Sequence, residues 1–260
     1  MKYTDLDKRM KGNYENRDKT FLTRKVPVIT RIDGKAFHTF CRRFEKPYDQ
    51  FFNDAMADVL KHLCENIQGA KMGERHSDEL SILITDYDSL QTDAYFDYNT
   101  QKISSVVASM ATAELCKILS SGGALNRRIS WEESWPCFDA RCFNIPREEV
   151  GNYFWWRMLD AKRNSVSMNA QANFSHKALQ GKNSNEMQEM LWGECDINWN
   201  DLPQRQKVGD LCLKTQIDKE IEKGPDAGLT VKRNVWVIEG SPKTRSELAE
   251  IVEPFVSYHE

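Results

Sequence analysis

The sequence has 260 residues, of which 40% are hydrophobic and 29% charged, and its mean hydropathy is −0.64. This length supports one sizeable core, or a core with a smaller lobe. No run reaches the roughly 18 apolar residues that a transmembrane helix needs, and the polar N-terminus lacks the apolar segment of a secretory signal. We therefore expect no membrane association.

Charge and cysteine content narrow the functional class further. The net charge is −3 and the pI about 6.0, which argues against a histone-like nucleic-acid binder but allows a local basic patch for RNA. Seven cysteines form an odd set without C-x-x-C pairs. This pattern argues against a disulfide framework or a zinc site, and it predicts reduced thiols in a cytoplasmic protein.

The first third of the chain predicts a helix, a strand and a second helix. Residues 5–20 are typical of a short polar helix, and residues 26–32 are β-branched and apolar, as in a buried strand. That strand ends abruptly at Asp33-Gly34. Pro47 begins a segment that reaches about residue 67, where apolar residues recur at helical spacing.

The following segments predict two strands, a helix, a strand and a helix. Residues 69–76 and 79–85 form the strand pair, with Ser77-Asp78 at the tight turn between them. A helical pattern occupies 101–120, an alternating strand pattern occupies 137–145, and Pro146 begins a helix that reaches about residue 163. The later segments predict helices, a short strand or turn near 207–215, a mobile polar loop at 216–228 and a strand at 229–239.

This order of elements predicts the fold class. The order β-α-β-β-α-β followed by a helix is that of the ferredoxin-like fold, which polymerase palm domains share. We therefore expect an α+β palm with a helical C-terminal extension. Residues 1–165 would form the palm-like catalytic domain, and residues 166–260 would form an extension packed on it.

Three acidic residues come together in this topology. The first and third strands are antiparallel neighbours, so Asp33 at the end of one should lie beside Asp78 and Glu79 at the start of the other. Magnesium prefers hard oxygen ligands and keeps waters or phosphates as further ligands. We therefore predict that Asp33 and Asp78, with a backbone carbonyl, hold Mg²⁺, with two ions in the site. Such ions activate a hydroxyl and neutralise a leaving phosphate.

Five motifs in order, over about residues 30–165, resemble those of the tRNA-histidine guanylyltransferase family. Arg31–Phe40 matches R-x-D-G-x-x-F-H-x-F, and Phe44–Asp49 matches F-x-K-P-x-D. The other three are Ser77–Ser81 (S-D-E-[YF]-S), Phe138–Arg141 (F-D-x-R) and Tyr153–Asp160 (Y-x-x-W-R-x-x-D). The resemblance implies an enzyme that adds nucleotides to the 5′ end of tRNA in the 3′–5′ direction, with ATP or GTP activating that end before a nucleotide 3′-hydroxyl attacks it.

The resemblance also implies residue roles and an assembly. The implied metal ligands are Asp33, the Gly34 carbonyl and Asp78. The implied catalytic residues are Asp33, Asp78, Glu79 and the activation-step lysine Lys46, although the role of Glu79 is open. The implied nucleotide-binding residues are Asp33, Gly34, Lys35, Ala36, Phe37, His38, Lys46, Ser77, Asp78, Lys102 and Asn164. The expected partners are tRNA, GTP and ATP, in a homotetramer.

Two segments depart from the family pattern. The basic R-R-x-x-K element is reduced to residues 99–102, where only Lys102 matches. The H-I-N-N-L-Y-N element of enzymes that add G to tRNA-histidine corresponds to residues 162–168, where only Asn164 remains. The sequence therefore resembles the bacterial and phage Thg-like branch, which implies templated repair of 5′-truncated tRNA, with G−1 addition to tRNA-histidine as the alternative.

Other interpretations of the same residues stay open at this point. A palm-type nucleotide cyclase would use the same carboxylates, although F-x-K-P and F-D-x-R do not favour it. A non-catalytic RNA-binding module is a further alternative, against which the intact Asp33/Asp78 pair argues. Several basic residues are equally compatible with an RNA-facing or a merely solvated surface: Lys162, Arg163, Lys177, Lys182, Arg205 and Lys207.

Overall fold

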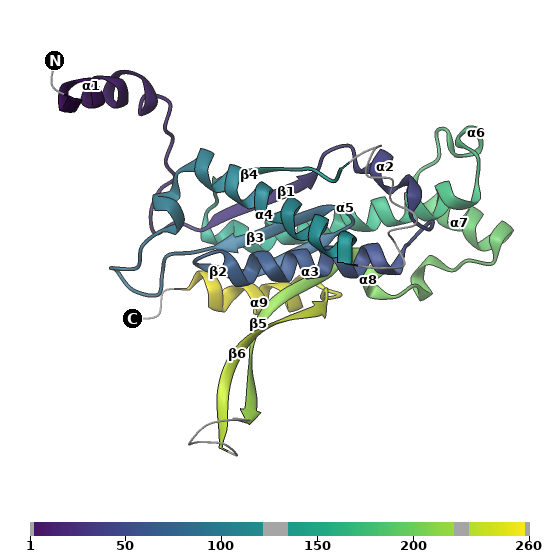
Figure 1. Cartoon of the computed structure of the whole chain (residues 1–260). Coiled ribbons are helices and arrows are strands. Elements are labelled where there is room, and N and C mark those ends of the chain that lie inside the picture. Colours follow the sequence, from purple (N-terminus) through teal and green to yellow (C-terminus); the bar gives the residue numbers. More distant parts are fainter. Residues whose placement is uncertain (1–2, 122–134, 221–228, 258–260) are drawn as a thin grey trace.

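A six-stranded antiparallel sheet forms the centre of the computed structural model, which describes residues 3–121, 135–220 and 229–257 (Figure 1). The strand order is β4-β1-β3-β2-β5-β6. The strands are β1 (Val28–Gly34), β2 (Ala70–His76), β3 (Glu79–Ile84), β4 (Phe138–Asn144), β5 (Asp210–Glu220) and β6 (Thr230–Gly240). The first four strands have the ferredoxin-like arrangement, so the predicted α+β palm is confirmed.

The helices follow the predicted order along the chain. The longer ones are α1 (Tyr3–Met10), α3 (Gln50–Asn66), α4 (Thr100–Ser121), α5 (Arg147–Asn173), α7 (Ser184–Cys195) and α9 (Arg245–Val256). The short ones are η1 (Lys11–Glu15), α2 (Phe37–Phe40), η2 (Cys41–Arg43), η3 (Tyr95–Tyr98), α6 (His176–Leu179), η4 (Trp199–Asp201) and α8 (Gln204–Val208). Helix α1 stands apart from the body (Figure 1), and with η1 it ends at residue 15 rather than at the predicted 20.

Two apolar layers cover the sheet because alternate strand residues point to opposite faces. On β1, Val28 and Ile32 belong to the core that includes α3 and α4. Ile29 belongs to the core on the other face, which α5 and α9 complete. Since both faces are buried, β1 and β3 appear in the sequence as nearly continuous apolar runs, which explains why their positions could be predicted.

Helix α4 is long and apolar enough, by length and composition alone, to cross a membrane. It nevertheless supplies a fully buried stripe to the core beside α3, and it packs against β1 and β4. The stripe consists of Ile103, Val107, Ala111, Leu115 and Leu119. Its apolar character is therefore explained by its place in the palm.

The C-terminal part is continuous with the palm. Helix α5 runs ten residues past the predicted end, through residue 173, so the division expected at residue 165 falls inside it. Strand β5 pairs with β2, and β6 pairs with β5, which extends the palm sheet by two strands. The structure thus gives no break at 165, and the extension contains helices together with the strand pair β5 and β6.

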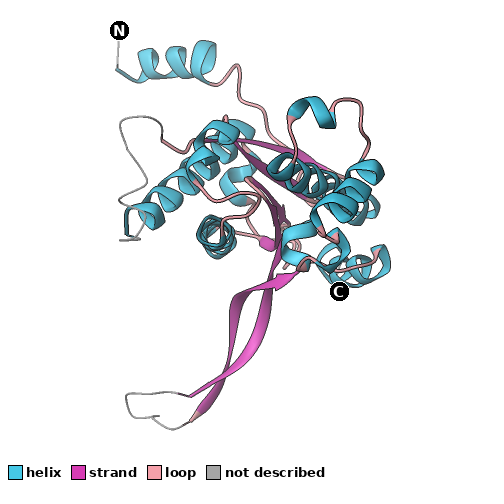
Figure 2. Ribbon diagram, turned by 90° about the vertical axis from the view of Figure 1, so that its right-hand side faces the viewer, coloured by secondary structure: helices cyan, strands magenta, loops and turns pink. Residues whose placement is uncertain are grey.

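The strands β5 and β6 form a long hairpin that projects from the body (Figure 2). We predicted a short strand near 207–215 and a mobile loop at 216–228. Residues 216–220 instead continue β5, and residues 221–228 lie outside the described part. The outer half of β5 is exposed on both faces, so no core imposes an apolar alternation there.

Gly209 connects α8 to β5 at the place where the added strands meet the palm. Its φ is +84°, and a Cβ on it would lie 1.7 Å from the Arg75 carbonyl oxygen. We expect Gly209→Ala to lower the free energy of unfolding by at least about 3 kcal/mol, because strain and a backbone clash act together. Urea denaturation would measure this effect.

Gly151 provides the matched control for that substitution. It lies in α5, and a Cβ on it would meet no atom within 4 Å. Gly151→Ala should leave the protein unchanged or stabilise it by up to about 1 kcal/mol. Equal effects of the two substitutions would contradict the importance of the Gly209 contact.

Candidate functional site

Asp33 and Asp78 meet at one end of the central strands. Strand β1 pairs antiparallel with β3, which brings the end of β1 beside the turn before β3. A Cβ on Gly34 would lie only 2.7 Å from Oδ2 of Asp78. Burial raises the pKa of the Asp78 carboxyl, and the neighbouring charge of Asp33 raises it further. The two carboxylates thus converge as the sequence predicted.

The oxygen atoms at this place suit a hard divalent cation. Two like-charged carboxylates held together raise the proton affinity of Asp78, and a cation between them would relieve that repulsion. Gly34 leaves room for close approach because it lacks a side chain. Among the described residues no group of three or more His, Cys, Asp or Glu could hold a metal ion, so further ligands would have to come from the backbone, substrate or water.

Glu79 is held between two arginines. Its Oε2 accepts a hydrogen bond from Arg31 on β1, and Arg157 on α5 donates to its two oxygens at 2.6 and 2.8 Å. Burial opposes its charge, but hydrogen bonding to His76 and the charges of His76, Arg157 and Arg31 lower its pKa to about 2. A catalytic role for Glu79 stays a prediction, and these contacts favour positioning instead.

The segment after β1 turns sharply and anchors itself in the core. Ala36 has a φ of +55°, and Phe37 is buried against the rings of Phe40 and Phe138. The Lys35 N–H donates to the Cys137 carbonyl at 2.8 Å, so this amide is not available for phosphate. The Lys35 and His38 side chains are exposed. Phe37 is therefore a packing residue, and its side chain does not line the pocket described next.

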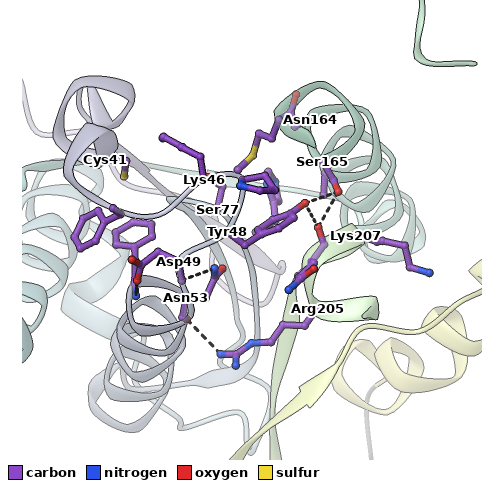
Figure 3. Close-up of a pocket in the computed structure, with 18 of the residues that line it drawn as sticks. Cys41, Lys46, Tyr48, Asp49, Asn53, Ser77, Asn164, Ser165, Arg205 and Lys207 are labelled. Carbon is purple, nitrogen blue, oxygen red and sulfur yellow. Dashed lines mark hydrogen bonds between the residues drawn. The ribbon is translucent and has the colours of Figure 1, made fainter. Parts of the chain in front are cut away.

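A pocket of about 80 Å³ lies among the F-x-K-P-x-D segment, the Ser77 turn, α5 and α8 (Figure 3). Three predicted nucleotide-binding residues line it: Lys46, Ser77 and Asn164. Phe44 and Phe52 contribute apolar surface. Because Ser77 directly precedes Asp78, the pocket opens beside the carboxylate pair. It offers apolar, cationic and amide groups in one concave place, as ligand sites commonly do.

Hydrogen bonds from distant segments fix the walls of this pocket. Asp49 accepts from the amides of Phe52 and Glu45, which caps α3 and holds the preceding loop. The Tyr48 hydroxyl is 2.6 Å from the Ser165 hydroxyl and donates to the Gln206 carbonyl. The wall therefore joins α5 and α8 to the F-x-K-P-x-D segment before any ligand binds.

Comparisons with known proteins agree with this geometry. The family described as tRNAHis guanylyltransferase matches residues 7–146. The chain is 30% identical to the tRNA(His) guanylyltransferase of Candida glabrata over 210 residues, which span 71% of this chain and 81% of that protein. The chain belongs to the tRNAHis guanylyltransferase family.

Solved structures place it near a bacterial group. A bacterial tRNA(HIS) guanylyltransferase (Thg1)-like protein in complex with ATP is 41% identical, with a TM-score of 0.83, and the match covers 98% of this chain and 100% of that one. A similar protein in complex with GTP is 40% identical, with a TM-score of 0.78 and coverage of 97% and 99%. The chain is therefore a nucleotidyltransferase that acts on tRNA.

Of two basic residues considered from the sequence, Lys102 does not line this pocket and Arg205 does. Lys102 is in the first turn of α4. The N-terminal end of α4 contacts Cys142, which pairs with Thr30 on β1. This contact lies toward the end of β1 that is away from Asp33. The structure does not bring Lys102 to the pocket, and its amine lies 4.7 Å from the centre of the Phe96 ring. Arg205, considered for RNA contact, pairs with Asp54 and with Asp210 at 2.9 Å.

Sequence reasoning missed Tyr48, Ser165 and His76 as parts of the site. All three line the pocket with the residues that had been predicted. Tyr48 lies inside the F-x-K-P-x-D motif, so its position in the sequence could have identified it as a site residue. His76 ends β2 directly before Ser77, so it too was marked by its position, whereas Ser165 becomes recognisable only when α5 is packed on the sheet.

Glu79→Gln should destabilise the protein at neutral pH by roughly 3 kcal/mol, because it leaves the buried Arg157 with only the partly exposed Asp160 as a carboxylate partner. The Glu79 carboxyl has a pKa of about 2 when folded, below its ordinary 4.5. Its stabilisation is therefore complete above pH 4.5 and is lost as the pH falls towards 2.

Urea denaturation of both proteins at a series of pH values measures this difference. The gap between wild type and Glu79→Gln should narrow as the solution is acidified. Glu148→Gln, which removes an exposed ion pair with Arg147, is the control and should leave stability nearly unchanged at every pH. A pH-independent gap would contradict the charged role of Glu79.

Proposed function

We propose that this chain adds nucleotides to the 5′ end of tRNA in the 3′–5′ direction with Mg²⁺ held by Asp33, Asp78 and the Gly34 carbonyl. The observation that carries the proposal is the convergence of Asp33 and Asp78 beside a pocket lined by Lys46, Ser77 and Asn164. When bound, divalent cations would neutralise phosphate charge and favour ionisation of an attacking hydroxyl.

The chain's own residues would position two substrates around this pair. The pocket would hold the nucleotide base or sugar, with Phe44 and Phe52 against its apolar face and Asn164 available for hydrogen bonds. Lys46 would place a positive charge near the triphosphate during activation of the RNA end. Since phosphoryl transfer requires little covalent chemistry from the protein, such positioning supplies most of the catalysis.

Templated repair of 5′-truncated tRNA is the preferred substrate class. The relatives at 40–41% identity are described as bacterial guanylyltransferase-like proteins bound to ATP or GTP. The departure at residues 162–168 from the H-I-N-N-L-Y-N element supports the same choice. Addition of G−1 to tRNA-histidine is the alternative. We further propose a cytoplasmic homotetramer, for which light scattering of the purified protein is the direct measurement.

Asp33→Asn and Asp78→Asn should each reduce nucleotide transfer by at least about a hundredfold while keeping the fold. The assay offers labelled GTP or ATP with Mg²⁺ to intact and 5′-truncated tRNA, and it includes a chelator arm that should abolish transfer. Circular dichroism and thermal unfolding verify folding of the variants.

Asp139→Asn is the matched control for these two substitutions. Asp139 lies directly across from Asp33 on β4, but its exposed carboxylate pairs with Arg141 at 2.8 Å. It should retain activity within a few-fold. Full activity of both site variants would overturn the mechanism, and faster transfer to intact tRNA-histidine than to truncated tRNA would favour the alternative substrate.

Lys46→Ala should slow transfer to 5′-monophosphorylated tRNA far more than transfer to 5′-triphosphorylated tRNA. The triphosphate end already carries a leaving group, so it bypasses the activation step that Lys46 would assist. Parallel rate measurements on the two RNAs test this split. An equal loss on both would assign Lys46 to a step after activation.

A further inference from the structure

Glu74 is a buried carboxylic acid that the proposed reaction does not use. It lies on β2, between Ser81 of β3 and Leu211 of β5, with 0% exposure. Neither of its carboxyl oxygens has a hydrogen-bond partner among the described residues. A buried polar group without a partner is costly and rare in folded proteins, so its presence calls for a functional explanation.

Charged and titratable groups face Glu74 from four elements. Strand β2 contributes His76, β3 contributes Glu79, β1 contributes Arg31, and α5 contributes Tyr153 and Arg157. Strand β5 presents the apolar Leu211. The positive charge of Arg75 lowers the pKa of the Glu74 carboxyl, although the Arg75 side chain itself pairs with Asp210.

These neighbours bond to one another rather than to Glu74. His76 and Arg157 contact Glu79, and the Tyr153 hydroxyl is 3.0 Å from that of Ser81. Burial raises the pKa of the Glu74 carboxyl to about 7, which the nearby Glu79 charge reinforces. Glu74 is therefore uncharged on the acidic side of neutrality, and it acquires a buried charge in the alkaline range.

An ionised Glu74 would act on the ion pairs that hold the catalytic strand ends together. Glu79 joins Arg31, two residues before Asp33, to Arg157 on α5, and Glu79 itself directly follows Asp78. A new negative charge beside this group would attract Arg157 and His76 and repel Glu79. The competition would loosen the arrangement that keeps Asp33 and Asp78 beside each other.

We propose that Glu74 is a positioning residue that must stay uncharged for Asp33 and Asp78 to keep their productive arrangement. This inference rests on the proposed function for its catalytic consequence. When Glu74 is ionised, the enzyme binds nucleotide more weakly and turns over more slowly. The loss of activity at alkaline pH therefore reports the ionisation of Glu74. The acid contributes no proton to the reaction and touches no substrate.

Glu74→Gln is the deciding variant, because it keeps the size of the side chain but cannot ionise. The full chain is assayed for GTP transfer to truncated tRNA with Mg²⁺ from about pH 6 to about pH 9. We expect wild type and variant to have similar kcat at the acidic end. Above pH 7 the ratio of wild-type to variant kcat should fall by up to about tenfold for each pH unit.

A second readout separates this inference from the proposed function. Binding of a non-hydrolysable GTP analogue in Mg²⁺, without RNA, should weaken with rising pH in wild type and stay level in Glu74→Gln. If wild type transfers nothing to any tRNA, the proposed function fails while the binding comparison still tests Glu74. Parallel pH profiles of wild type and variant in both assays would overturn the role of Glu74.

Two further variants guard against ambiguous results. Glu74→Leu removes the ionisable group in a different way, so it serves if the amide prevents folding, and it should also abolish the alkaline limb. Tyr153→Phe removes the phenol group that lies near Glu74. Burial raises the pKa of this phenol to about 12, so the variant should keep the alkaline limb. A uniform loss at all pH values in both Glu74 variants would assign Glu74 a purely structural role and overturn the proposal.

Discussion

The pairing of Glu79 with Arg31 and Arg157 is the interaction on which the site depends. The three residues belong to β3, β1 and α5, so their contacts fix two strand ends and the covering helix at one point. Glu79 and Arg157 are buried and Arg31 is partly exposed, so the attraction within the buried pair is weakly screened and either ion of that pair would be costly alone. The convergence of Asp33 and Asp78, two carboxylates that repel each other, is held against that repulsion by this group and by the strand pairing beneath it.

The acidic residues of this region have different pKa values because their surroundings differ. Glu79 has cations on two sides, and the pKa of its carboxyl is lowered to about 2. Glu74, five residues earlier and on the same sheet face, has no hydrogen-bond donor in the part of the chain that the structure describes, and the pKa of its carboxyl is raised to about 7. The pKa of the Asp78 carboxyl is raised because burial and Asp33 oppose its charge, although Ser77 and a backbone amide support it. Local partners, rather than residue type, thus assign each acid its state.

The palm could be predicted from the sequence because its strands and helices carry strong periodic patterns. Strand β1 is buried on both faces, α3 has a regular apolar stripe, and Asp33 and Asp78 stand at strand ends that the topology brings together. Positions that depend on long-range packing could not be predicted. Lys102 matched a motif, but the direction of α4 carries it to the far end of the sheet. Ser165 reaches the pocket only through the docking of α5, and β5 continues beyond its core, where no burial pattern marks a strand.

The β5–β6 hairpin has a mechanical consequence. Its eleven paired positions form an uninterrupted backbone ladder, and β5 continues that ladder onto β2 through four further pairs. Strand β2 ends at His76, immediately before the turn that carries Asp78. A force applied to the projecting arm would therefore act, through hydrogen-bonded strands, on the strand that ends at the Ser77–Asp78 turn.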